Sequence, residues 1–166
     1  MTIISLFLRE LEEESLTTRK MLSRVPTDKL DWQPHPKSMM MRNLAVHIAE
    51  LPTWISMAFQ INELDFAANP YQQPVVSNTE DILEVFEKSL VDGKTQLIEE
   101  NAARLGERWT LRHGEMILWD ADRWGVIRMA ISQIIHHRAQ LGVYLRLLNI
   151  PIPGSYGPSA DEQSFS

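Results

Sequence analysis

Residues 123–148, RWGVIRMAISQIIHHRAQLGVYLRLL, are the most regular segment of the chain and decide its fold class. Side chains suited to a protein interior recur there at alternating steps of four and three residues, the spacing of one face of an α-helix. One histidine, His137, lies within this face. The segment predicts a long helix whose inward face comprises Val126, Ala130, Ile134, His137, Leu141, Tyr144 and Leu148.

Clusters of proline divide the rest of the chain into long intervals. The first interval has a stripe with the same four-three spacing from Ile4 to Val25, so a helix is expected there. The second opens with Ser38 as a candidate N-cap and continues past Pro52. Because proline cannot donate to the preceding helical turn, we expect a kink one turn beyond His47 rather than the end of the helix.

A third helical interval begins at residues 77–80, Ser-Asn-Thr-Glu, which fit a capping box, and continues through Leu97. Between residues 106 and 122 the spacing changes to an alternation about His113 and Gly114, which predicts an extended, hairpin-like crossover. No internal repeat is present. The pattern therefore predicts one all-α domain over residues 1–166, with four helices joined by three long connections.

The composition excludes several classes of function. The chain has 166 residues, of which 44% are hydrophobic, enough for one core, and it has no cysteine, which excludes disulfides, thiolate zinc sites and a cysteine nucleophile. The net charge of -6 and the lack of a basic, aromatic-rich stretch argue against nucleic acid as a partner. No signal peptide or membrane span is predicted, so we expect a cytoplasmic protein without a membrane partner.

Two histidines on different predicted helices point toward the same interior. His137 lies on the apolar face of the last helix, Gln133 lies one turn earlier at its edge, and His47 lies on the buried face of the second helix. Imidazole is a common metal ligand, and helical proteins build metal sites in their cores. A histidine that is simply hydrogen-bonded within the core is the alternative for both positions, and for Gln133 it is a solvated or capping side chain.

Other candidate residues give weaker signals. His136 points away from the apolar face, where it would support a neighbouring ligand, contact a second subunit or be exposed. Glu12, Glu13 and Glu14 are consecutive and predict a solvated helix face rather than a carboxylate pair. The loop residues His35 and His113 are expected to be exposed. No GxSxG, GxGxxG or Walker motif occurs.

Four segments together resemble the DinB/YfiT-like family, which is distinct from the DNA polymerase of the same name. They are residues 32–38 (WQPHPKS), 44–50 (LAVHIAE), 136–141 (HHRAQL) and 156–162 (YGPSADE), and the resemblance extends over nearly the whole chain. It implies a four-helix bundle in up-down-down-up order, usually dimeric, with a divalent metal held by three histidines. Characterised members include thiol-dependent S-transferases, and most members have no assigned reaction.

The family's metal ligands correspond to His47, Gln133 and His137 in this chain. Gln133 departs from the family pattern, which has histidine there, so the resemblance implies a zinc or nickel site that binds weakly or stays empty. The expected function is metal-dependent transfer to a thiol or hydrolysis, acting on a small-molecule or thiol substrate in a homodimer. The alternative is a metal-free, dimeric helical-bundle binding module.

Overall fold

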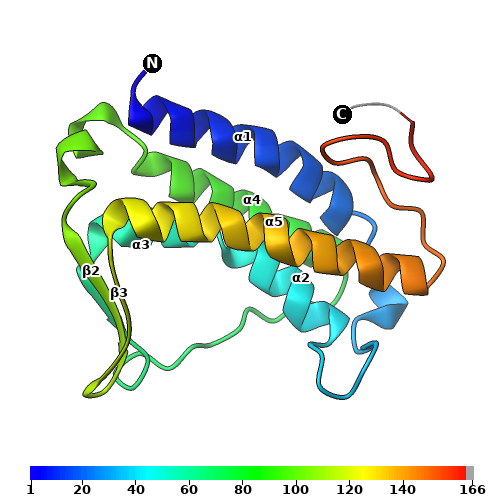
Figure 1. Ribbon diagram of the computed structural model, residues 1–166. Helices are drawn as coiled ribbons and strands as arrows, with labels where there is room; N and C mark the ends of the chain where they lie inside the picture. The colour runs from blue at the N-terminus through cyan, green and yellow to red at the C-terminus, as the bar shows by residue number, and fades with distance from the viewer. Residues whose placement is uncertain (164–166) are drawn as a thin grey trace.

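The computed structural model describes residues 1–163 and shows a mostly helical protein with a small sheet at one end (Figure 1). In chain order the elements are α1 (Ile3–Leu22), the 3₁₀-helix η1 (Thr27–Lys29), α2 (Met41–Glu50), α3 (Thr53–Gln60), β1 (Glu63–Asp65), α4 (Thr79–Thr95), the 3₁₀-helix η2 (Glu99–Arg104), β2 (Arg108–His113), β3 (Met116–Asp122) and α5 (Arg123–Leu147).

The core lies where the helices pack against one another. Helix α5 contacts α1, α2 and α3, and helix α4 contacts the same three helices. Each helix buries its apolar stripe in this core; on α5 the buried side chains include five of the seven positions of the predicted inward face. The predicted length of α5 is confirmed to within one residue at its C-terminal end. The five buried positions of the predicted inward face are Val126, Ala130, Ile134, Leu141 and Tyr144.

Pro52 interrupts the second helical interval more strongly than the predicted kink. Helix α2 ends at Glu50 and α3 begins at Thr53, although Leu51 and Pro52 keep right-handed helical dihedral angles. Proline has no N–H to continue the hydrogen-bond ladder, so the helix breaks into two pieces at this point. Because α4 packs closely against the break, a Cβ atom built on Gly93 would lie 2.5 Å from the carbonyl oxygen of Pro52.

Two helix N-caps lie at residues other than those predicted. Helix α2 has Met40 as its N-cap, without a side-chain hydrogen bond, so the prediction of Ser38 is wrong. Helix α4 is capped by Asn78, whose side-chain oxygen accepts from the N–H of Asp81 at 2.8 Å. The cap therefore lies one residue later than predicted, because Asn78 and not Ser77 occupies the cap position.

The extended crossover is confirmed as an antiparallel hairpin of β2 and β3. Gly114 in its turn has a φ of 58°, a conformation that favours glycine. Strand β1, which the sequence did not predict, pairs in parallel with β2 and gives the order β1-β2-β3. The predicted all-α class is therefore correct only in its helical part, because β1, β2 and β3 form a small sheet.

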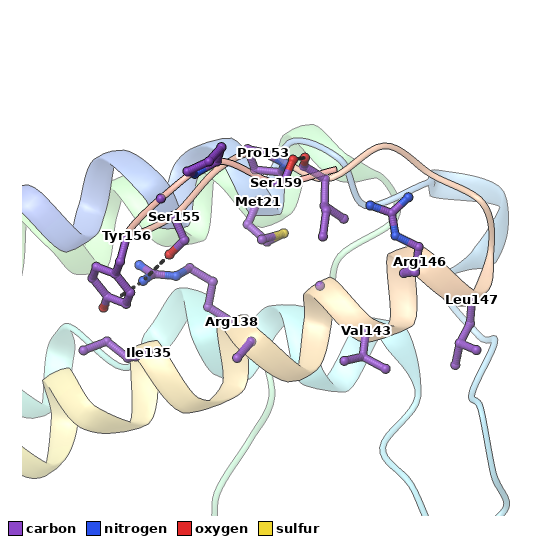
Figure 2. A pocket seen from close by; sticks show the side chains of 15 residues that line it. Met21, Ile135, Arg138, Val143, Arg146, Leu147, Pro153, Ser155, Tyr156 and Ser159 are labelled. Atoms are coloured by element: carbon purple, nitrogen blue, oxygen red, sulfur yellow. Dashed lines mark hydrogen bonds between the residues drawn. The ribbon is translucent and has the colours of Figure 1, made fainter. Parts of the chain in front are cut away.

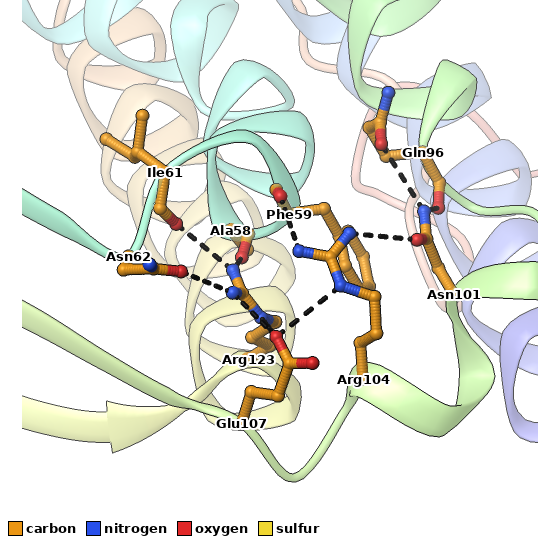
Figure 3. A network of polar contacts seen from close by, with 9 residues as sticks. All are labelled: Ala58, Phe59, Ile61, Asn62, Gln96, Asn101, Arg104, Glu107 and Arg123. Carbon is orange, nitrogen blue, oxygen red and sulfur yellow. Dashed lines mark hydrogen bonds and ion pairs between the residues drawn. The ribbon is translucent and has the colours of Figure 1, made fainter.

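Arg123 ties this sheet to the helices (Figure 3). Its guanidinium is nearly fully buried and donates to the carbonyl oxygens of Ala58 and Ile61 at the end of α3. It also forms an ion pair with Glu107, just before β2, at 2.7 Å. One arginine therefore fixes the end of α3, the entry to β2 and the start of α5 relative to one another.

Within residues 1–163, no helix has both the length and the apolar character needed to cross a membrane.

Candidate metal site

His47 on α2 and His137 on α5 lie next to each other in the helical core. Their ring centroids are 4.7 Å apart and their planes are inclined by 74°, an edge-to-face contact between two helices that are distant in sequence. Both side chains are partly buried. The prediction that these two imidazoles lie within reach of one another is confirmed.

The surroundings of both rings favour the neutral form that binds metals. Burial lowers the pKa of His47, and the neighbouring His137 lowers it further. Burial also lowers the pKa of His137; a hydrogen bond with Gln140 partly offsets this effect. In that bond, Nδ1 of His137 lies 2.8 Å from the side-chain oxygen of Gln140. If Nδ1–H donates, the lone pair on Nε2 stays free to bind a ligand.

Gln133 lies one turn before His137 on α5. Its side-chain oxygen is buried and has no hydrogen-bond partner among the described residues. A buried carbonyl oxygen without a donor is costly, so it suits a cation or a donor supplied from outside the chain. The contacts of the described residues bring together the two imidazoles, and residues 1–163 contain no group of three or more His, Cys, Asp or Glu arranged to hold a metal. Gln133 stays a predicted third ligand.

The other histidines are exposed. His136 is exposed, and its ring centroid lies 4.9 Å from that of His137, so it adjoins the site from outside. His35 is exposed in a connecting segment, whereas His113 is exposed at the end of strand β2 and not in the predicted loop. These positions add no further ligand to the pair.

A pocket of about 420 Å³ adjoins His47. Glu50, one turn after His47 on α2, lies in its wall, and the hydroxyl of Tyr71 donates to the Oε2 atom of Glu50. Burial raises the pKa of Glu50, and burial together with Glu50 raises the pKa of Tyr71. The apolar part of the wall consists mainly of Trp54, Met57, Leu64 and Phe66.

Neither Glu50 nor Tyr71 was a candidate from the sequence. The spacing of Glu50 from His47, three residues along a helix, was the available signal, because such positions share one face. Tyr71 gave none, since it belongs to a long connection whose path depends on the folded structure.

A second cavity, of about 640 Å³, lies between α5 and the C-terminal segment (Figure 2). Arg138 borders it and forms a 2.5 Å ion pair with Glu14 of α1, and both side chains are almost completely buried. Tyr156 donates to Glu14 at 2.6 Å and accepts from Arg138 at 3.0 Å. The prediction of a solvated face for residues 12–14 is therefore wrong for Glu14, although Glu12 and Glu13 are exposed.

The chain belongs to the DinB family, whose model matches residues 1–164. Three solved structures share its fold. A DinB-like protein from Bacillus subtilis is 14% identical with a TM-score of 0.67, covering 96% of this chain and 99% of that one. One from Bacillus cereus is 19% identical with a TM-score of 0.67, covering 90% and 95%. A protein assigned to the DinB family from Exiguobacterium sibiricum is 22% identical with a TM-score of 0.69, covering 92% and 96%. No curated protein matches the chain.

Proposed function

We propose that this DinB-family protein is a metal-dependent enzyme that holds a divalent ion with His47, Gln133 and His137. The proposal is carried by the contact between the two imidazoles, whose centroids are 4.7 Å apart and whose pKa values are both lowered. Two neutral imidazoles that meet in a helical core suit zinc or nickel, which favour nitrogen ligands.

Each residue around the candidate metal would have a distinct role. His47 and His137 supply nitrogen ligands, and Gln140 fixes the orientation of the His137 ring. The buried oxygen of Gln133 is available as a weaker third ligand. A bound divalent ion supplies Lewis-acid chemistry, which polarises a substrate or lowers the pKa of a thiol or water. The adjoining pocket would hold the substrate beside His47.

The reaction class that fits this arrangement is transfer to a thiol or hydrolysis. The proposal includes an up-down-down-up bundle for the helices and a cytoplasmic homodimer as the working form. Nucleic acid and membranes are not among the proposed partners, given the net charge of -6.

Elemental analysis of protein purified without a histidine tag tests this proposal. After dialysis against a buffer that contains trace zinc or nickel, we expect metal in the wild-type protein. The variants His47→Ala and His137→Ala should contain clearly less metal. His113→Ala is the matched control, because this histidine is exposed in the hairpin. Equal metal content in all four proteins would contradict the proposal and favour the metal-free binding module.

A further inference from the structure

We infer that the pocket beside His47 binds a small molecule with an aromatic or aliphatic body and one amino group, and that Glu50 recognises the amino group. This inference rests on the proposed function in one respect, because it names the substrate class of the same site. The contacts that carry it belong to the pocket and not to the candidate ligands.

The size and the wall of the pocket fit a small organic molecule. Its volume of about 420 Å³ lies in the range of small-molecule sites. Three aromatic side chains line the same space: Trp54 comes from α3, and Phe66 and Tyr71 come from the connection between β1 and α4. Flat apolar walls of this kind remove the body of a ligand from water and favour its binding.

The charge of the pocket selects for a cation. Glu50 is a partly buried carboxyl group in the wall, and no Lys or Arg is among the described residues that line the pocket. A carboxylate beside aromatic faces attracts an ammonium group through both an ion pair and cation–π contacts. A carboxylate or phosphate on the ligand would be repelled by Glu50 and would find no Lys or Arg in the described wall, where His47 is the one histidine.

The hydrogen bonding of Glu50 leaves one carboxylate oxygen available to an ammonium group. Tyr71 occupies Oε2, while Oε1 has no hydrogen-bond partner among residues 1–163. An ammonium group carries three donors, so it can bond to Oε1 while Tyr71 keeps Oε2. The phenol of Tyr71 thus holds the carboxyl group in place and leaves Oε1 available as an acceptor.

Three probes with one common body test the inference: 3-phenylpropylamine, 3-phenylpropanol and 3-phenylpropionate. Calorimetry or ligand-observed NMR is carried out near pH 7.5 on metal-stripped wild-type protein. We expect the amine to bind about tenfold or more tightly than the carboxylate, as a charged hydrogen bond implies, and more tightly than the alcohol. Carboxylate affinity equal to that of the amine would overturn the inference without any mutation.

Glu50→Gln keeps the shape and can still accept from Tyr71, so it isolates the charge. We expect it to lower amine affinity by about tenfold and to leave alcohol affinity nearly unchanged. Glu13→Gln, which removes an exposed carboxylate on α1, is the charge-matched control and should change nothing. Unchanged amine affinity in Glu50→Gln would refute recognition by Glu50.

The metal-stripped protein keeps this test separate from that of the proposed function. Amine selectivity without metal retention would leave the pocket assignment standing and reject the enzyme. Metal retention without amine selectivity would reject only the substrate class. Circular dichroism and thermal melting establish that each variant is folded.

Discussion

The imidazoles of His47 and His137 meet edge to face with their centroids 4.7 Å apart. Helix α2 supplies one ring and α5 the other, and burial lowers the pKa of each. Two histidines that lose a proton easily and share one part of the core cannot both be charged without mutual repulsion. The pair therefore suits a bound cation better than a pair of protonated side chains.

The stability of the protein should depend on pH through His47 and His137. The pKa values of His47 and His137 lie below the usual 6.5, so protons bind to the unfolded chain before they bind to these sites. Stability from this source is complete above about pH 6.5 and falls as the pH drops toward the lowered pKa values. NMR titration of the imidazoles should show both midpoints below that of a free histidine.

Urea unfolding at several pH values measures directly how the free energy of unfolding depends on pH. His47→Gln should flatten the loss of stability between neutral and acidic pH, whereas His113→Gln, at an exposed position, should leave the slope unchanged. Identical slopes in the wild type and His47→Gln would show that the histidine pair does not carry the effect.

The buried ion pair of Arg138 and Glu14 should be costly to break from one side. Arg138→Met leaves the Glu14 carboxylate buried without its 2.5 Å partner, so we expect a loss of about 3–5 kcal/mol in the free energy of unfolding. The double variant Arg138→Met/Glu14→Leu should lose much less, because no charge is left unpaired. Equal losses in the single and double variants would argue against this account.

Tyr156 links the C-terminal segment to that ion pair. Burial and the hydrogen bond to Glu14 raise the pKa of Tyr156 to about 12. Tyr156→Phe removes the hydrogen bonds with both Glu14 and Arg138, so it should cost about 2 kcal/mol in the same unfolding experiment. The difference between the stability losses of Tyr156→Phe and Arg138→Met separates the contribution of hydrogen bonding from that of the buried charge.

Two helical glycines should respond in opposite directions to the same substitution. Gly93→Ala would place a Cβ atom 2.5 Å from the carbonyl oxygen of Pro52, so we expect a loss of about 1–3 kcal/mol. At Gly142 the nearest atom is the flexible end of Met21 at 3.6 Å. Gly142→Ala should therefore stabilise by about 0.5–1 kcal/mol through helix propensity. Thermal melting measures both, and a stable Gly93→Ala would refute the tight contact at the α2–α3 break.

The proposed dimer is tested through two exposed apolar side chains of α5. Val143 and Leu147 lie on α5 beside the second cavity (Figure 2). They are 59% and 58% exposed, and a dimer contact would remove them from water. Light scattering at micromolar concentration should give twice the 19.1 kDa of one chain, and Val143→Glu should give the monomer. Val91→Glu, at an exposed position of α4, is the control. A wild-type monomer would exclude this assembly.

The sequence predicted the parts of the fold that depend on local periodicity. The long run of apolar positions around His137 placed α5 to within one residue, since a 25-residue helix has many turns that agree with one another. The hairpin was also predicted, because Gly114 and the alternation around it are local signals. The approach of His47 to His137 was predicted from two buried helix faces together with the resemblance to the DinB family.

The parts that were missed depend on partners distant in the chain. Strand β1 has only three residues and exists through its parallel pairing with β2, which no pattern of that length can reveal. Glu14 looked solvated among its neighbours because its partner, Arg138, lies on the last helix. Tyr71 reaches Glu50 from a connection without regular structure, so their hydrogen bond was equally hidden.

The central claim is that His47, Gln133 and His137 form one metal site, and calorimetric titration of tag-free protein with zinc tests it most directly. We predict weak binding of one zinc ion per chain in the wild type. In Gln133→His the affinity should rise by about tenfold or more, since imidazole replaces an amide oxygen. His47→Ala should abolish binding in both backgrounds, while Gln60→His, which adds an exposed histidine elsewhere, should change nothing. Equal, feeble zinc uptake by all these proteins would contradict the claim.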